Sequence, residues 1–337
     1  MKRVFAANAA RAFRGATGVA PGAYRGGPGA HRGGLPAGTT LVFGIGATRA
    51  GTSWLYRYLA QHPDCALPPI KELHFFDRAA GGAAFALDGL RRVESRAAQA
   101  LARAKTGAEA LAARRRLDAA RALARILDAE TPDLDAYLSF LADQLRDGAH
   151  LVADITPAYG LLPAETLGRM AGLCEDVRFV YVLREPVARL WSNMRLMAAR
   201  RARVSGVDRA QALSRISRRW LDGKEPELDA RANYAATLEN LGRAVPEDQR
   251  LVLFHEDLFD PERGPATVEA LAVFLGIRPM AAPLCDVVHD APPAELPPAL
   301  RAEMRARLAP QYEAVARYAG GRLPAAWIAA QNDVTES

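Results

Sequence analysis

The sequence has 337 residues, of which 50% are apolar and 24% charged, a composition typical of folded proteins and a length that allows one large domain or two small ones. Its formal net charge of +6 comes from residues 1–40, which contain six Lys and Arg residues and no Asp or Glu, so residues 41–337 are neutral overall. This neutral body excludes the basic footprint typical of a nucleic-acid-binding domain, and no apolar run reaches the roughly 20 residues that span a bilayer.

The N-terminal segment and the cysteines indicate where the protein works. Residues 1–39 are rich in Gly, Ala, Pro and Arg, show no hydrophobic periodicity and lack the apolar core of a secretory signal. We expect 1–39 to be a disordered basic tail and 40–330 to form a single domain. Cys65, Cys174 and Cys285 are odd in number and follow no metal-binding spacing, so we expect reduced thiols in a cytoplasmic protein without a metal site.

The first predicted element is a buried strand that leads through a glycine loop into a helix. Residues 41–45 form a short apolar run, as in a central parallel strand, and apolar residues recur at helical spacing from Trp54 onward. A helix is therefore expected to begin near Gly51, with its positive dipole end and free N–H groups facing the loop. This arrangement predicts an anion site, although a glycine turn that binds nothing has the same outline.

The loop differs from the nucleoside-triphosphate-binding loop, which reads G-x-x-x-x-G-K-[ST]. Gly46 and Gly51 keep its spacing, but Thr52 and Ser53 follow directly, without the lysine that reaches the terminal phosphates. The cation of this loop is Arg49, which lies inside it. We interpret the loop as a site for one phosphate group and what is attached to it.

Further strands and helices alternate along the chain. Strands are predicted at 150–155, 177–183 and 250–254, and helices at 137–145, 166–173, 186–197 and 266–275. The alternation predicts an α/β fold of three layers, with a mostly parallel central sheet flanked by helices. Binding sites in such sheets lie beyond the carboxyl ends of the strands.

Two arginine-rich helical segments interrupt this alternation. Residues 78–132 are expected to form an inserted helical hairpin, and residues 198–230 a helical segment on the acceptor side of the site. The cluster at 114–116 consists of three arginines that could hold an anionic acceptor. A run of charge is more often a solvated face, which is the interpretation that we favour here.

A second anion site is predicted at the end of the strand at 177–183. A nucleotide triphosphatase commonly has a magnesium-binding aspartate at the end of its second strand, whereas Arg184 stands here, followed by Glu185 and Pro186 at the start of a helix. Ser192 lies about two helical turns beyond Glu185 on the same helix face. Arg184 and Ser192 could together hold a phosphate. Pairing of Arg184 with a surface carboxylate is the alternative.

Two separate phosphate sites without an evident magnesium site match the ligand 3′-phosphoadenosine 5′-phosphosulfate. GATRAGTSWLYRYLAQHP at 46–63 resembles the 5′-phosphosulfate loop of sulfotransferases, and LREPVARLWSN at 183–193 resembles their 3′-phosphate motif. PPIKELHFFD at 68–77 is similar to the block that follows the loop in the carbohydrate-type, heparan-modifying branch. ITPAY at 155–159 and RLVLFHEDL at 250–258 fit as well. The resemblance to this P-loop-type sulfotransferase family spans roughly 40–327.

The resemblance implies roles for individual residues. The 5′-phosphosulfate would be held by Arg49, Ala50, Gly51, Thr52, Ser53 and Trp54, and the 3′-phosphate by Arg184 and Ser192. Glu72 would be the base for the acceptor hydroxyl, with Arg49 stabilising charge and His74 assisting in positioning or proton handling. The Pro68-Pro69 pair favours an extended approach, in which Glu72 and His74 point to the same side. A surface carboxylate paired with Lys71 is the alternative for Glu72, and a satisfied, half-buried histidine is the alternative for His74.

Two positions depart from the family pattern. Arg49 stands where members usually have lysine; it keeps the positive charge but cannot donate a proton at neutral pH. Arginine outnumbers lysine by 40 to four, as expected from a GC-rich, bacterial-like genome, so an exchange of lysine for arginine is unsurprising. Ile155 stands where the heparan-modifying branch tends to have lysine, and Lys71 is a candidate for the missing charge.

The sequence therefore predicts a sulfotransferase that moves a sulfo group in line from 3′-phosphoadenosine 5′-phosphosulfate to an acceptor hydroxyl, without a metal ion or a nucleic-acid partner. The acceptor could be a carbohydrate, a glycolipid or a small metabolite. A P-loop kinase or nucleotidase, and a non-catalytic nucleotide-binding protein of the same fold, are the alternatives.

Overall fold

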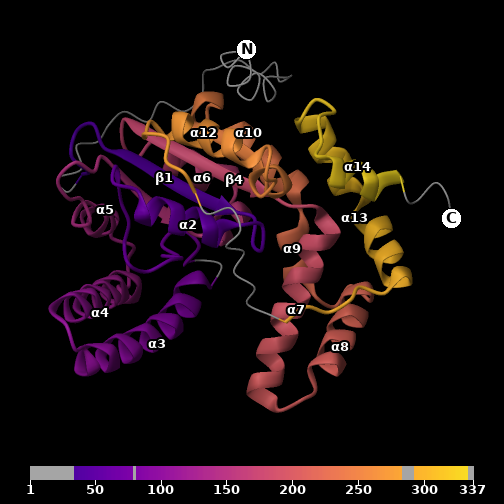
Figure 1. The fold of residues 1–337 in the computed structure, drawn as a ribbon, viewed down its shortest axis with the longest axis horizontal. Helices are drawn as coiled ribbons and strands as arrows, with labels where there is room; N and C mark the ends of the chain where they lie inside the picture. Colours follow the sequence, from indigo (N-terminus) through magenta and orange to yellow (C-terminus); the bar gives the residue numbers. More distant parts are fainter. Residues whose placement is uncertain (1–33, 79–80, 283–291, 333–337) are drawn as a thin grey trace.

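A computed structural model of the protein describes residues 34–78, 81–282 and 292–332. Its centre is a five-stranded sheet with the strand order β2-β3-β1-β4-β5 (Figure 1), in which every pairing is parallel. The strands are β1 (Thr40–Gly46), β2 (Cys65–Ala66), β3 (Leu151–Ile155), β4 (Asp176–Leu183) and β5 (Arg250–Phe254). Apart from residues 34–39, the predicted disordered tail lies outside the described residues, as does Cys285.

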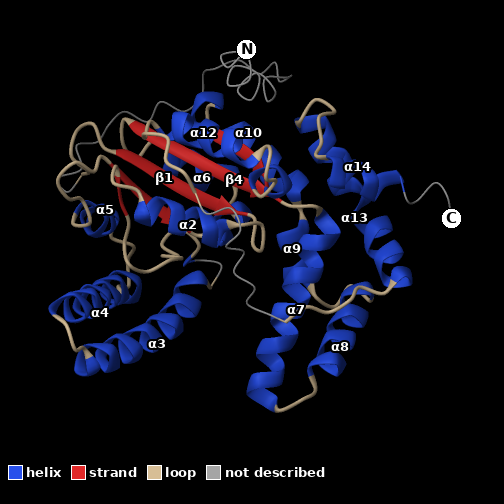
Figure 2. Cartoon of the chain, in the orientation of Figure 1, coloured by secondary structure: helices blue, strands red, loops and turns tan. Residues whose placement is uncertain are grey.

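Helices cover both faces of the sheet (Figure 2), and β1 and β3 are therefore buried at every position. Such strands need apolar residues on both sides, which is why 41–45 reads as a nearly continuous apolar run. At Gly44 the neighbouring strand approaches so closely that an added Cβ would lie 2.7 Å from Ile155 Cδ1. The predicted α/β fold with a parallel sheet flanked by helices is confirmed, while the extent of the domain, 40–330, stays a prediction.

Helices account for more than half of the described residues. They are α2 (Thr52–Gln61), α3 (Gly82–Arg103), α4 (Gly107–Asp128), α5 (Leu134–Ala142), α6 (Ala164–Ala171), α7 (Pro186–Ser205), α8 (Arg209–Leu221), α9 (Pro226–Ala232), α10 (Tyr234–Ala244), α11 (His255–Leu258), α12 (Gly264–Leu275), α13 (Pro298–Tyr318) and α14 (Ala325–Asn332), with 3-10 turns η2 (Pro157–Leu161) and η3 (Glu247–Gln249). The predicted helices correspond to α5, α6, α7 and α12, whereas α10, α13 and α14 were not predicted.

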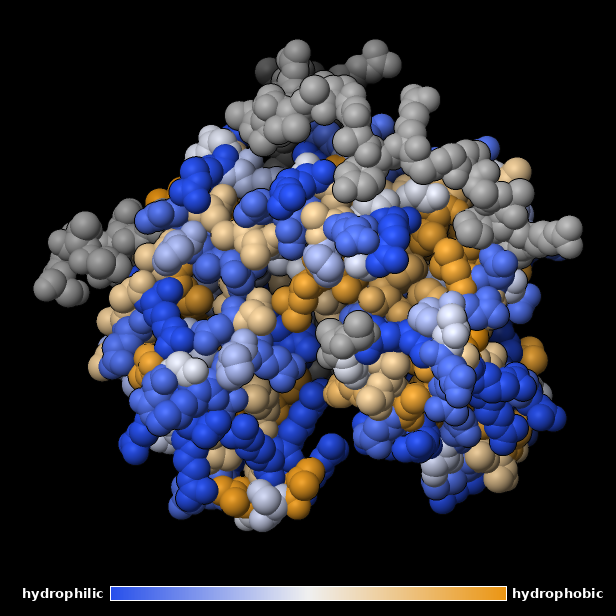
Figure 3. All heavy atoms as spheres, turned by 180° about the vertical axis from the view of Figure 1, so that it is seen from behind, coloured by the Kyte–Doolittle hydropathy of each residue, from blue (hydrophilic) through white to orange (hydrophobic). Residues whose placement is uncertain are grey.

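The two arginine-rich segments form helical projections on the same side of the sheet (Figure 1). Within residues 78–132, α3 packs against α4, which begins at a capping box between Thr106 and Glu109. α7 crosses residue 198 as one helix and ends at Gly206, a left-handed C-cap with φ 68°. Seen from behind (Figure 3), mostly hydrophilic side chains cover both projections and a gap separates them.

The carboxyl ends of the strands meet at one edge of the sheet. Gly44 pairs with Ile155, Gly46 with Tyr181, and Leu183 with Phe254. The segments that leave these strands therefore begin side by side: the glycine loop after β1, η2 after β3, Arg184 after β4 and α11 after β5. This is the edge at which parallel sheets bind ligands, and it positions the candidate site.

Candidate functional site

The glycine loop joins β1 to α2 with the geometry of an anion site. Gly51 is the N-cap of α2 at φ 110°, and a Cβ there would lie 3.2 Å from Phe259 Cε2, so glycine is required. No side chain caps this helix, which leaves its first N–H groups directed toward the loop. Thr52 is buried and Ser53 exposed at the same helix end. The backbone and two hydroxyls thus offer several donors to one anion.

Two of the predicted cofactor-binding residues, Ala50 and Trp54, are buried and pack between the loop and the core. Ala50 is fully buried, and its carbonyl accepts a hydrogen bond from His255 Nδ1 at 3.1 Å. Trp54 is buried in the core, where its ring stacks on Tyr58 with centroids 5.2 Å apart. The Ala50 and Trp54 side chains therefore face away from a ligand in the loop. Burial lowers the pKa of His255 to about 4, and the charge of Arg184 acts in the same direction, so this imidazole is neutral at pH 7.

The two predicted anion sites are physically joined. Arg49 Nε donates to Ser192 Oγ at 3.2 Å, and Arg184 Nη1 donates to the Arg49 carbonyl at 3.1 Å. Burial lowers the pKa of Arg184, and the charges of Arg49 and Arg195 lower it further against the opposing charge of Glu256. Cations crowded in this way are electrostatically unfavourable until an anion lies between them. The structure thus brings together the loop cation, the strand-end arginine and the helix serine.

Sequence reasoning missed one further arginine of this cluster. Arg195 lies one helical turn beyond Ser192 on α7, and burial together with the charges of Arg49 and Arg209 lowers its pKa. Its buried Nε has no hydrogen-bond partner among the described residues. The spacing of three residues from Ser192 could have indicated it. Glu185, in contrast, caps α7 by accepting from the Val187 and Ala188 N–H groups at 3.2 and 2.6 Å.

We had predicted that the segment with Glu72 and His74 is extended, but at these two residues it is not. Glu72 has φ 66° and His74 has φ 55°, so both adopt left-handed backbone conformations. Their side chains nevertheless face one another, with His74 Nε2 lying 3.8 Å from Glu72 Oε2. Asp77 accepts a 2.8 Å hydrogen bond from His74 Nδ1 on the other side of the ring. The result is a row of Glu72, His74 and Asp77.

A buried network holds this row in place. The backbone N–H groups of Leu73 and Phe75 donate to Thr156 Oγ1 and to the Tyr159 hydroxyl, both at 2.9 Å. These two hydroxyls donate in turn to Asp154 at 2.6 and 2.8 Å. The ITPAY motif therefore supports the loop from β3, because its hydroxyls bond the peptides on either side of His74.

The charges within the row depend on each other. Burial alone would lower the pKa of His74, but its hydrogen bond to Asp77 and the nearby carboxylate of Glu72 raise it to about 9, so the ring is an imidazolium at neutral pH. Burial alone would raise the pKa of Glu72, but the nearby imidazolium of His74 and the charge of Lys71 lower it to about 2. Glu72 is thus ionised and partly exposed, at 38% of its side chain. His74 can donate hydrogen bonds but cannot accept a proton.

Lys71 brings a second cation to the glycine loop, which lacks the lysine of the nucleoside-triphosphate-binding loop. Its Nζ lies 3.3 Å from both Thr52 Oγ1 and Ser53 Oγ, and 3.0 Å from Glu72 Oε1. The pairing with Glu72, which the sequence left as an alternative, is therefore present. The same ammonium group also reaches the glycine loop from a different segment of the chain. It contacts both the anion site and the carboxylate that would act as base.

Backbone strain is concentrated in three residues of the candidate site. Among the described residues, Arg49, Glu72 and His74 are those other than glycine with a positive φ, at 71°, 66° and 55°. Such conformations are retained only where the surroundings enforce them, and they cluster at functional sites. All three are residues that the sequence resemblance made catalytic.

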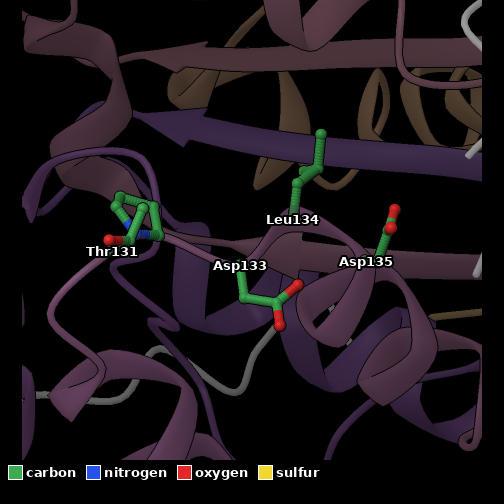
Figure 4. A pocket seen from close by; sticks show the side chains of 5 residues that line it. Thr131, Asp133, Leu134 and Asp135 are labelled. Carbon is green, nitrogen blue, oxygen red and sulfur yellow. The ribbon is translucent and has the colours of Figure 1, made fainter.

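A hollow away from this edge is shown in Figure 4. It has a volume of about 380 Å³ and lies where the chain enters α5, lined by Thr131, Pro132, Asp133, Leu134 and Asp135. Asp133 is occupied as the N-cap of α5, accepting from the Ala136 N–H at 2.9 Å. None of the predicted site residues lines this hollow, so it is not the candidate site.

Within residues 34–78, 81–282 and 292–332, no helix combines the length and the apolar character needed to cross a membrane. The same described residues contain no cluster of three or more His, Cys, Asp or Glu side chains suited to a metal ion.

Comparison with known proteins identifies the family. The model of the sulfotransferase family matches residues 42–281. A sulfotransferase from Alicyclobacillus acidocaldarius has a similar structure, with 24% identity, a TM-score of 0.54, and coverage of 85% of this chain and 97% of its own. The sulfotransferase domain of the Synechococcus PCC 7002 olefin synthase has 19% identity, a TM-score of 0.38 and coverage of 83% and 96%. The sulfotransferase domain from the curacin biosynthetic pathway has 16% identity, a TM-score of 0.44 and coverage of 82% and 98%. Comparison with curated protein sequences finds no match. Because the family model covers well over half of the chain, the protein belongs to the sulfotransferase family.

Proposed function

We propose that this sulfotransferase uses 3′-phosphoadenosine 5′-phosphosulfate as its donor and a hydroxyl group as its acceptor. The contact that carries the proposal is the chain from Ser192 through Arg49 to Arg184, with distances of 3.2 and 3.1 Å. It joins two cationic sites on separate strands into one surface for a ligand with two phosphate groups. A donor that carries a 5′-phosphosulfate and a separate 3′-phosphate has this distribution of charge.

The donor would lie across the carboxyl edge of the sheet. The α2 N-terminus, Thr52 and Ser53 would bind the 5′-phosphosulfate, with Arg49 and Lys71 as its cations. Arg184 and Ser192 would bind the 3′-phosphate. Arginine suits a phosphate because its guanidinium can donate two parallel hydrogen bonds, and it stays charged at any physiological pH.

The transfer then requires one proton acceptor. The acceptor oxygen bonds to sulfur, the bond between sulfur and the bridging phosphate oxygen breaks, and the hydroxyl proton passes to a base. The negative charge that leaves with the bridging oxygen stays on adenosine 3′,5′-bisphosphate. We assign the base to Glu72, the carboxylate that contacts Lys71 at 3.0 Å and whose charge His74 balances at 3.8 Å. The imidazolium of His74 orients Glu72 rather than taking the proton.

Lys71 would connect donor binding to the strength of this base. While Lys71 contacts Glu72, its charge helps to lower the pKa of Glu72 to about 2. An efficient general base has a pKa near the pH at which the enzyme works, so this value is too low. A donor sulfonate in the loop would compete with Glu72 for the Lys71 ammonium. Withdrawal of the ammonium toward the donor raises the pKa of Glu72 when the acceptor must be deprotonated. Unlike Arg49, Lys71 can also give a proton to the bridging oxygen.

Binding of the product adenosine 3′,5′-bisphosphate tests the donor assignment without requiring a known acceptor. Arg184→Ala should weaken binding in calorimetry by about 1.5–3 kcal/mol, the range for hydrogen bonds to charged groups. Arg243→Ala on α10 is the control, because its side chain is 69% exposed. Unchanged affinity of Arg184→Ala would contradict the assignment.

Transfer itself is tested with a donor carrying labelled sulfur and a panel of hydroxyl compounds, followed by mass spectrometry for the gain of one sulfo group. A P-loop kinase or nucleotidase would instead show phosphoryl chemistry that stops when magnesium is chelated. A non-catalytic binding protein would bind adenosine 3′,5′-bisphosphate and transfer no sulfo group to any compound.

A further inference from the structure

The helical hairpin carries a groove beside the candidate site. The groove has a volume of about 890 Å³ and runs between α3 and α4, with Pro69 from the loop before Glu72 as part of its lining. Its size falls within the range of about 300–1,000 Å³ for small-molecule sites. Arg116 lines it, so at least one member of the arginine cluster that we had interpreted as a solvated face borders a hollow.

Small side chains create the hollow. Ala97 and Ala100 on α3 and Ala112 and Ala113 on α4 line it, together with Val93. Ala97 and Ala113 are 3% and 8% exposed, so they lie at the contact between the helices. A methyl group at each of these positions keeps the helices close while leaving space above them. The lining is therefore apolar along the helix contact.

Four cations surround this apolar surface. Arg96, Arg103, Lys105 and Arg116 line the groove and are exposed, and Glu109 is its one carboxylate. Glu109 is occupied by the capping box, accepting from the Lys105 and Thr106 N–H groups at 2.7 and 3.3 Å. Within the described part of the chain, none of the four cations forms an ion pair. Four like charges around an apolar surface favour a ligand that is both anionic and amphiphilic.

The groove is connected to the reaction site through α2. Tyr56 donates to the Pro68 carbonyl at 2.7 Å, next to the Pro69 that lines the groove. Burial raises the pKa of Tyr56 and the charge of Arg116 partly offsets this, which places Arg116 within electrostatic reach of the Tyr56 hydroxyl. Tyr56 follows Thr52 by one helical turn, about 5.4 Å. Pro69, which lines the groove, lies three residues before Glu72, so the groove adjoins the segment that carries the candidate base.

We propose that this groove binds the acceptor, and that the acceptor is an elongated amphiphilic anion, such as a long-chain hydroxy acid. Its apolar body lies on the alanine surface, its carboxylate meets the arginines, and its hydroxyl reaches Glu72. This proposal rests on the proposed function, because it names the substrate of the same reaction.

The test compares 12-hydroxydodecanoate with its neutral methyl ester. Binding of each is measured by calorimetry in the presence of adenosine 3′,5′-bisphosphate, so that the result does not depend on turnover. We expect the wild type to bind the acid at least ten times more tightly than the ester. The double variant Arg103→Gln/Arg116→Gln should lose this preference, with a ten- to hundred-fold weaker affinity for the acid. It should still bind adenosine 3′,5′-bisphosphate normally.

The matched control is Arg114→Gln/Arg115→Gln, which removes the same charge from the same helical hairpin at exposed positions that do not line the groove. This control should retain the preference for the acid. Equal binding of acid and ester by the wild type, or equal effects of both double variants, would overturn the proposal. Tight binding of a hexuronic acid oligomer without binding of the hydroxy acid would overturn it in favour of an acidic saccharide. If the wild type does not bind adenosine 3′,5′-bisphosphate, that result would instead contradict the proposed function.

Discussion

Thr156→Val tests how the loop with Glu72 and His74 is held. The Thr156 side chain is fully buried, where its hydroxyl accepts from the Leu73 N–H at 2.9 Å and donates to Asp154 Oδ1 at 2.6 Å. Valine keeps the shape of threonine and removes both hydrogen bonds. Two buried polar groups then lose a partner, at a cost of about 1–3 kcal/mol each.

The expected loss of stability is in the lower part of that combined range. Asp154 keeps the bonds that Tyr137 and Tyr159 donate to its other oxygen, at 2.9 and 2.8 Å. Burial already raises the pKa of Asp154, so protonation can relieve the oxygen that loses Thr156. We therefore expect the free energy of unfolding to fall by about 2–4 kcal/mol, measured by urea denaturation.

The effect on activity should exceed what this loss of stability explains. Leu73 lies between two left-handed residues, and their strained conformations persist only while the peptide between them is fixed. Release of Leu73 should lower kcat at least tenfold, about 1.4 kcal/mol in the barrier, while affinity for adenosine 3′,5′-bisphosphate changes less than about twofold. Thr237→Val is the control, because this buried threonine donates to the Gly160 carbonyl at 2.8 Å instead of to the loop. A normal kcat in Thr156→Val, at temperatures where it is folded, would refute the reasoning.

Two further predictions concern charges around Glu72. Lys71→Met should lower kcat by about 10²–10³, the usual effect of removing one preorganised donor, while Lys71→Arg should keep more of the donor affinity than of kcat because arginine cannot give up a proton. Steady-state kinetics with saturating donor decide this, and an unchanged kcat in Lys71→Met would exclude the role. His74→Gln should make stability less dependent on pH. The pKa of His74 is raised from 6.5, its value in the unfolded chain, to about 9 in the folded protein. The charged ring therefore stabilises the fold fully below pH 6.5, and this stabilisation is lost as the pH rises through 9. The wild type should be more stable than His74→Gln by up to about 3 kcal/mol at pH 6, and this difference should narrow by pH 10 in denaturant titrations; a constant difference would contradict the charge state given to His74.

Much of the anion-binding edge could be predicted from local sequence. A phosphate site is built from a strand, a tight turn and the first turn of a helix, so its parts lie within a few residues of one another. The apolar run, the glycine spacing and the hydroxyls at 41–53 therefore indicated β1, the loop and α2 correctly. Arg184 and Ser192 were predicted in the same way, because Arg184 directly follows β4 and Ser192 lies eight residues later on α7.

Boundaries and short elements were predicted less well. The end of α7 is set by Gly206, a capping signal that the sequence offers but that the arginine-rich run before it obscured. β2 has two residues, too few for a pattern, and exists because Cys65 and Ala66 pair with β3. Propensity cannot indicate a strand whose stability comes from its neighbour.

The tertiary structure alone decided the chemistry around Glu72. The left-handed backbone at Glu72 and His74 is imposed by bonds to β3 and η2, more than 80 residues away in sequence, and no local propensity favours it. Lys71 became the second cation of the glycine loop because packing brings it to Thr52 and Ser53, 19 and 18 residues earlier in the chain. Sequence spacing therefore determined the candidate anion site, since that depends on local backbone geometry. Which lysine, carboxylate and imidazole surround the anion was decided by long-range hydrogen bonds, whose partners no local pattern specifies.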